Sequence, residues 1–157
     1  MEKILQRFFE ENELEPITIE TEEGKHHRFS ISLDNTSAEC LLEENQQFCS
    51  LVFMIFLPVK MVGGQFARVA EFVSIINCFS RTGCFIVDQD TGIIMYRSDG
   101  LNGSLATQDY DQLIINIEGA IRMMRRFYPG FMTLMYSRSA VKDIFMQCAN
   151  IPLTHYN

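Results

Sequence analysis

The chain has 157 residues, of which 47% are hydrophobic and 21% charged, so it has the composition of a globular protein with enough residues for one substantial core. Its net charge of −7 argues against nucleic-acid binding, which depends on basic residues that neutralise phosphates. No apolar run is long enough to span a bilayer, and five cysteines without a Cys-x-x-Cys pair are untypical of a secreted disulfide framework. We therefore expect a single domain over residues 1–157, in the cytoplasm, with reduced thiols and without contact to a membrane.

Acidic residues are concentrated in the first third of the chain. Residues 1–47 hold 12 acidic and 4 basic side chains, whereas residues 48–157 hold 8 acidic and 9 basic ones. This asymmetry indicates either a solvated flank or an electrostatic docking face for a protein partner.

The first predicted element is a helix over residues 3–12, where Ile4, Leu5, Phe8 and Phe9 recur at helical spacing. Three strands are expected next, at 28–33, 38–43 and 48–57, with turn-forming residues between them. The third of these strands is apolar over almost its whole length. Such a strand is typical of a central position that is covered on both faces.

A helix and a hairpin are predicted in the middle of the chain. The helix covers residues 65–80, because apolar side chains recur there at i, i+3, i+4 and i+7. Two further strands, at 84–88 and 93–97, follow it and flank a turn that is rich in Asp and Gly.

Two helices are expected to complete the chain, one over 109–128 and one over 131–148. Pro129-Gly130 separates them, because proline lacks the N–H that a helix interior needs and glycine weakens a helix. The order α-βββ-α-ββ-αα, with hairpin-connected strands, predicts an α+β fold with a five-stranded antiparallel sheet. Helices on one side cannot cover both faces of its apolar strands. We therefore expect the fourth helix or a partner chain to cover the second face.

The stretch CFIVDQDTGIIMYR at 84–97 contains two motifs that can carry chemistry. Asp-Thr-Gly at 90–92 is the triplet of aspartic proteases, and together with Asp88 it resembles the start of a calcium loop. Isoleucine follows the triplet where those proteases have a small residue, and serine stands where the calcium loop requires glutamate. The favoured interpretation is a hairpin turn, in which aspartate forms local hydrogen bonds and glycine adopts positive φ.

No pattern indicates a metal or a cofactor. His26 and His27 are adjacent, so in a strand they point to opposite faces, and we interpret both as solvated surface residues. Cys78 and Cys84 lack the second pair that a zinc site would need, and we interpret them as buried free thiols. We predict no catalytic residue, no metal ligand and no cofactor.

Four arginines are candidates for contacting an anion or an acidic partner. Arg122, Arg125 and Arg126 share one face of the third predicted helix, and Arg97 ends a strand. A solvated face with an ion pair between Glu118 and Arg122 is the alternative.

Four apolar residues are candidates for a binding interface: Phe8, Phe9, Met132 and Met135. Five of the nine methionines fall within residues 123–146, and flexible thioethers suit adaptable binding surfaces. Filling of the core is the alternative.

Residues 68–136 follow the pattern of a known family. The pattern is a helix ending near Asn, a Gly-x-Phe strand start, an Asp/Gly hairpin, a strand ending in Tyr-Arg and a long helix closing on Tyr-Pro. It is found in FVSIINCFSRTGCFIVDQDTGIIMYR and in IRMMRRFYPGFMTLMY. The matching residues are Asn77, Gly83, Phe85, Asp88, Gly92, Tyr96, Arg97, Tyr128 and Pro129. This part of the chain resembles the YbjN family, whose members are labelled bacterial sensory-transduction regulators.

The resemblance implies the fold of class I type III secretion chaperones: a helix, three strands, a helix, two strands and a helix. Those chaperones are small, acidic, cytoplasmic homodimers that hold extended segments of partner proteins. The resemblance therefore implies protein binding without chemistry.

We expect a non-enzymatic protein-binding module, chaperone-like or regulatory, that acts as a homodimer. It would capture a segment of an unidentified protein partner on apolar surface or on an exposed sheet edge. The alternative is a sensor of a small ligand or anion that uses the basic residues of the third helix. An aspartate-dependent hydrolase at the Asp-Thr-Gly turn is a remote alternative.

Overall fold

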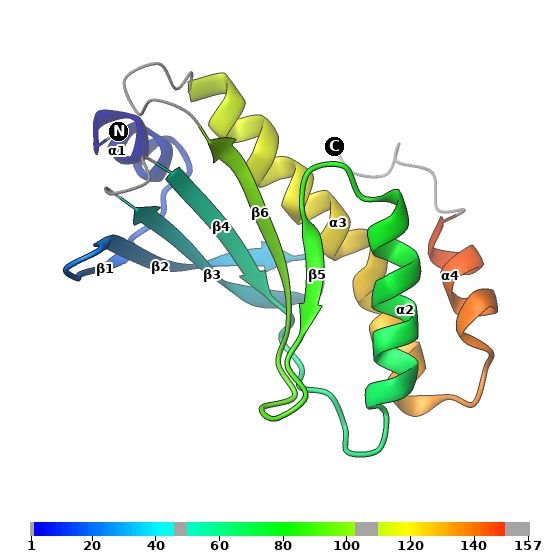
Figure 1. Ribbon diagram of the computed structural model, residues 1–157. Coiled ribbons are helices and arrows are strands. Elements are labelled where there is room, and N and C mark those ends of the chain that lie inside the picture. The colour runs from blue at the N-terminus through cyan, green and yellow to red at the C-terminus, as the bar shows by residue number, and fades with distance from the viewer. Residues whose placement is uncertain (1, 46–49, 103–109, 150–157) are drawn as a thin grey trace.

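The computed structural model describes residues 2–45, 50–102 and 110–149. In chain order the elements are α1 (Glu2–Glu11), β1 (Ile17–Glu20), β2 (Gly24–Leu33), β3 (Thr36–Asn45), β4 (Ser50–Phe56), α2 (Phe66–Phe79), β5 (Cys84–Val87), β6 (Ile94–Asn102), α3 (Tyr110–Tyr136) and α4 (Val141–Ala149). The expected α+β fold with an antiparallel sheet is confirmed (Figure 1). The predicted start of the third strand, at 48–49, and of the third helix, at 109, lie outside the described residues.

The sheet has six strands in the order β1-β2-β3-β4-β6-β5, and all neighbours are antiparallel. Five strands were expected. The additional strand is β1, which pairs with residues 25–28 of β2. Its sequence, Ile-Thr-Ile-Glu, does alternate apolar and polar side chains, but over only 4 residues, and the prediction left it out.

A row of side chains across the sheet forms the centre of the core. Phe29, Cys40, Ile55, Tyr96 and Phe85 lie opposite one another on five successive strands, and all five are buried. Helix α1 covers this face at β2, and α2 and α3 cover it at β5 and β6 (Figure 1). Each large apolar side chain buried here contributes about 1.5–3 kcal/mol, so this layer is a main source of stability.

The opposite face of the sheet carries no helix within the described residues. The adjacent row on this face is Ile17, Arg28, Leu41, Met54, Arg97 and Cys84. Only Met54 in this row is buried, and Ile17 is 69% exposed. Helix α4 packs against α2 and α3 instead, so the prediction that it could cover the second face is wrong. We call this surface the open sheet face.

Helix α3 continues through Pro129-Gly130, where a break was predicted. A Cβ atom added to Gly130 would lie 2.6 Å from Cζ of Phe72 and 2.7 Å from Sγ of Cys148. Glycine therefore lets α2, α3 and α4 approach closely at this point. Proline costs about 3 kcal/mol in a helix interior. Burial of α3 on both sides of Pro129, with Phe131 fully inaccessible, offsets this cost.

The connection between α3 and α4 divides the segment that was predicted as a single fourth helix. Arg68 on α2 stabilises this connection, because its guanidinium donates hydrogen bonds to the carbonyl oxygens of Leu134, Ser137 and Ser139 at 2.9, 2.7 and 2.6 Å. A helix leaves its last carbonyl groups without intrahelical partners, so Arg68 caps α3 from a neighbouring helix.

The outer edge of β5 is closed by a side chain of α2. Asn77 donates from Nδ2 to the carbonyl oxygen of Phe85 at 2.9 Å, and its Oδ1 accepts the Phe85 N–H at 2.8 Å. The amide thus imitates a neighbouring strand and satisfies the two backbone groups that an edge strand leaves open.

Candidate functional site

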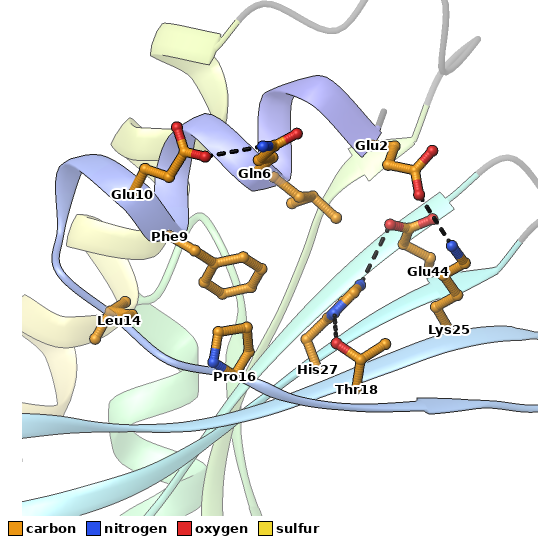
Figure 2. A pocket seen from close by; sticks show the side chains of 11 residues that line it. Glu2, Gln6, Phe9, Glu10, Leu14, Pro16, Thr18, Lys25, His27 and Glu44 are labelled. Atoms are coloured by element: carbon orange, nitrogen blue, oxygen red, sulfur yellow. Dashed lines mark hydrogen bonds and ion pairs between the residues drawn. The ribbon is translucent and has the colours of Figure 1, made fainter.

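A cavity of about 390 Å³ lies between α1 and the first three strands (Figure 2). Its apolar lining is Leu5, Phe9, Leu14 and Pro16, and its polar lining is Glu2, Gln6, Glu10, Thr18, Lys25, His27 and Glu44. Phe9 holds helix α1 over the sheet. The centroid of its ring lies 5.4 Å from the ring centroid of Phe29 and 5.5 Å from that of His27. We call this space the α1 cavity.

A chain of three polar side chains forms the floor of the α1 cavity. Thr18 Oγ1 lies 2.9 Å from His27 Nδ1, and His27 Nε2 lies 3.4 Å from Oε1 of Glu44. His27 is 7% exposed and Glu44 is 9% exposed. A hydroxyl, an imidazole and a carboxylate are thus connected across three adjacent strands, β1, β2 and β3.

The hydrogen bonds determine which ring nitrogen of His27 carries the proton. An ionised Glu44 can only accept hydrogen bonds, so Nε2 donates to it. In a neutral imidazole Nδ1 then accepts the hydrogen bond of the Thr18 hydroxyl. Both ring nitrogens are therefore occupied within the protein.

The alternation of strand β2 explains how His27 comes to lie in the cavity. His26 and His27 point to opposite faces, as predicted, because His26 lies opposite Glu43 and forms a 3.9 Å ion-pair contact with it. The interpretation of His27 as a solvated residue is wrong, because α1 covers it. The sequence signal was a pair of adjacent histidines on β2 and a pair of adjacent glutamates on β3. The register places His26 directly opposite Glu43, whereas His27 is opposite Leu42 and reaches Glu44 diagonally.

Three carboxylates, Glu2, Glu10 and Glu44, line the α1 cavity. Lys25 donates to Glu2 at 3.1 Å and lies 3.5 Å from Glu20. These contacts, foremost the hydrogen bond with Glu2, raise the pKa of Lys25. Gln6 donates to Glu10 at 2.8 Å on the exposed side of α1. The lining thus holds more acidic than basic side chains.

A second hollow, of about 440 Å³, lies on the open sheet face. Its apolar lining includes Ile19, Leu41, Phe56, Val59 and Ile93. The segment after β4 forms one side of it, and β1, β2 and β3 form the other. The open sheet face is therefore hollowed and largely apolar at this point.

Two of the four candidate arginines form local ion pairs. Arg97 pairs with Asp99 at 2.7 Å on β6, and Arg122 pairs with Glu118 at 3.3 Å on α3, as the alternative interpretation predicted. The hydrogen bond with Asp99 raises the pKa of Arg97.

The other two candidates bind backbone groups on different sides of α3. Arg125 donates to the carbonyl oxygen of Ser32 at 3.3 Å and lies 3.9 Å from Asp34. Arg126 donates to the carbonyl oxygens of Cys148 and Ala149 at the end of α4. The structure therefore does not bring the four arginines together.

Most of the apolar interface candidates lie inside the molecule. Phe8, Phe9 and Met135 are buried, and Met132 is half-buried against the core. Phe8 and Phe9 contact each other and Phe29, which fixes α1 on the sheet. These side chains form the core of one chain and present little surface to a second one.

The Asp-Thr-Gly segment forms the turn between β5 and β6. Asp88 accepts hydrogen bonds from the backbone N–H of Asp90 at 2.9 Å and from the Thr91 hydroxyl at 2.6 Å, and these bonds lower its pKa. Gly92 has a φ of 71°, in the left-handed region that favours glycine. Its carbonyl oxygen accepts the N–H of Met61 at 2.7 Å. The predicted hairpin turn is thus observed.

The cysteines differ in accessibility. Cys40 and Cys148 are buried, and burial raises the pKa of both thiols. Cys84 is half-buried, whereas Cys78 is exposed, so the prediction of a buried thiol is wrong for Cys78. Cys49 lies outside the described residues. Across the described ranges, no group of three or more His, Cys, Asp or Glu side chains has an arrangement that could hold a metal ion.

Neither the models of known protein families nor the curated proteins give a match to this chain. The resemblance to the YbjN family stays a prediction. Within the part of the chain that the structure describes, no helix has the length and apolarity needed to cross a bilayer.

Proposed function

We propose that this chain is a non-enzymatic protein-binding module, chaperone-like or regulatory, that works as a homodimer in the cytoplasm. The YbjN-like segment from 68 to 136 supports the same proposal. The open sheet face is the surface on which a second copy, or an extended segment of a partner, would bind.

The observation that carries the proposal is the absence of a helix over the open sheet face in the described residues. Exposed apolar side chains on it include Ile17 at 69% and Ile19 at 48% exposure. Grouped apolar surface of this kind is typical of interaction sites. The hollow beside Ile19 and Phe56 gives the surface a shape that a side chain of a partner could fill.

The edges of the sheet favour strand addition at one end. Asn77 closes the edge of β5, whereas all four residues of β1 are exposed. Thr21 and Gly24 exchange both of their backbone hydrogen bonds. Hydrogen-bonded and non-hydrogen-bonded residue pairs alternate along an antiparallel hairpin. The N–H and C=O groups of Thr18 and Glu20 therefore point away from β2. An extended peptide could pair with these groups.

Light scattering coupled to gel filtration tests the homodimer with two matched variants. Ile19→Lys places a charge on the open sheet face, and Ile115→Lys places the same charge on α3 at a residue that is 53% exposed. Surface substitutions of this kind change stability by about 0.5 kcal/mol or less. We expect a dimer for the wild type and for Ile115→Lys, and a monomer for Ile19→Lys. A monomeric wild type, or equal behaviour of the two variants, would refute the proposal.

A sensor of anions is the less favoured function, because the four arginines contact different groups rather than one common site. Thermal-shift measurements with nucleotides and inorganic phosphate test it. A rise in Tm that disappears in Arg122→Gln would favour the sensor over the binding module.

A further inference from the structure

Glu44 is a nearly buried carboxylate with unused hydrogen-bonding capacity. A carboxylate can accept about four hydrogen bonds. Within the described residues, the partner of Glu44 is Nε2 of His27, at 3.4 Å. This distance is long for a hydrogen bond to a charged group, which is usually about 2.7–2.9 Å. Burial of a charge is costly unless it is paired, so Glu44 offers the α1 cavity an acceptor that a bound donor would satisfy.

The neighbouring cations of the protein do not supply that donor. Lys25 lies directly opposite Glu44 on the adjacent strand, but its ammonium group is directed to Glu2 and Glu20. Both ring nitrogens of His27 are occupied, by Glu44 itself and by Thr18. The chain from Thr18 through His27 thereby positions Glu44 and occupies one of its acceptor sites.

The remaining lining describes the ligand that would fit. The lining carries three carboxylates, Glu2, Glu10 and Glu44, which outnumber its two basic side chains, Lys25 and His27, so its net charge is negative. The side chains of Leu5, Phe9, Leu14 and Pro16 are apolar. Figure 2 shows Phe9 and Pro16 on the side of the cavity nearest to His27. A cavity of about 390 Å³ is within the range of small-molecule sites, roughly 300–1,000 Å³.

We propose that the α1 cavity binds a primary ammonium group carried on an apolar stem, with the ammonium group on Glu44 and the stem against Phe9. This chemistry is found in free arylalkyl and alkyl amines and in the lysine side chain of a peptide. The proposal is independent of the open sheet face, which lies on the other side of the sheet.

NMR titration of the full-length protein with phenethylamine tests the site. We expect saturable shifts of the Thr18, Lys25 and His27 signals. The matched ligands are 2-phenylethanol, which replaces the ammonium group by a hydroxyl, and phenylacetate, which reverses the charge. Both should bind at least tenfold more weakly. Equal binding of the alcohol, or the absence of saturable shifts with the amine, would overturn the proposal.

The neighbouring glutamate provides a matched control variant. Glu44→Gln keeps the shape but removes the charge and should weaken phenethylamine binding at least tenfold. Glu43→Gln removes a charge next to it in the sequence but on the opposite face, and the affinity should stay within twofold. An equal effect of both variants would exclude the α1 cavity.

A surface variant keeps the test valid if Glu44→Gln does not fold. Glu10→Lys reverses a charge on the exposed side of α1 and should weaken amine binding several-fold. Unchanged binding in this variant would count against the site. Titration with N-acetyl-lysine methylamide distinguishes a peptide lysine from a free amine as the natural ligand. Binding at least as tight as that of phenethylamine indicates a peptide lysine, and weaker binding indicates a free amine. Either result is compatible with the site.

Discussion

Replacing Gly130 by alanine would place a methyl group where three helices meet. The new Cβ would lie 2.6 Å from the Phe72 ring and 2.7 Å from Sγ of Cys148, and carbon atoms do not approach so closely. The Phe72 ring cannot move aside easily, because it is fully buried between Phe127 and Phe131. Gly130→Ala therefore forces the helices apart or the side chains out of their rotamers.

Gly119→Ala in the same helix is the matched control. Its Cβ would lie 3.8 Å from Thr82 Oγ1, an ordinary van der Waals contact. Alanine has a better helix propensity than glycine by about 1 kcal/mol, and both variants gain this free energy. Overpacking a core costs about 1–3 kcal/mol. The difference between the variants isolates the packing cost, so Gly119→Ala should be more stable than Gly130→Ala by about 1–3 kcal/mol.

Urea unfolding followed by circular dichroism measures this difference, provided that the slopes of the two transitions agree. In thermal unfolding the same difference corresponds to about 2–4 °C per kcal/mol for a chain of this size. If Gly130→Ala were as stable as Gly119→Ala, the close approach of α2, α3 and α4 at Gly130 would be refuted.

Three further predictions concern capping groups. Asn77→Ala leaves the N–H and C=O of Phe85 without partners, so we expect the free energy of unfolding to fall by about 2 kcal/mol and the Phe85 amide to exchange faster. Unchanged protection of this amide would contradict the edge cap. In Arg68→Lys one ammonium group cannot reach all three carbonyl oxygens, so we expect a loss of about 1–2 kcal/mol and a Tm lowered by roughly 2–8 °C. An unaltered Tm would argue against the cap. The hydrogen bonds from the Thr91 hydroxyl and from the backbone of the turn lower the pKa of Asp88. The charged carboxylate therefore stabilises the fold fully at pH values above the pKa of the unfolded state, about 3.9, and this stabilisation is lost as the pH falls through the lowered pKa. Asp88→Asn should therefore reduce the acid sensitivity of urea unfolding, and a pH profile identical to that of the wild type would disprove it.

Local patterns in the sequence predicted the elements of the fold well. Helix α2 and the hairpin at Asp88 and Gly92 follow from apolar spacing and turn chemistry, both of which act between residues close in the chain. Strand alternation likewise predicted that His26 and His27 would point to opposite faces. These features depend on side-chain types and backbone geometry within a few residues of the chain, so the sequence by itself determined them.

Contacts between segments far apart in sequence decided the features that local patterns did not predict. Whether His27 is solvated or buried depends on α1 lying over β2, and its partner Glu44 is set by the register of β2 against β3. Helix α3 passes through Pro129 because packing around Gly130 outweighs the local preference for a break. The free energy of these features comes from burial between segments far apart in sequence. Only the tertiary structure could therefore decide the α1 cavity, the course of α3 and the open sheet face.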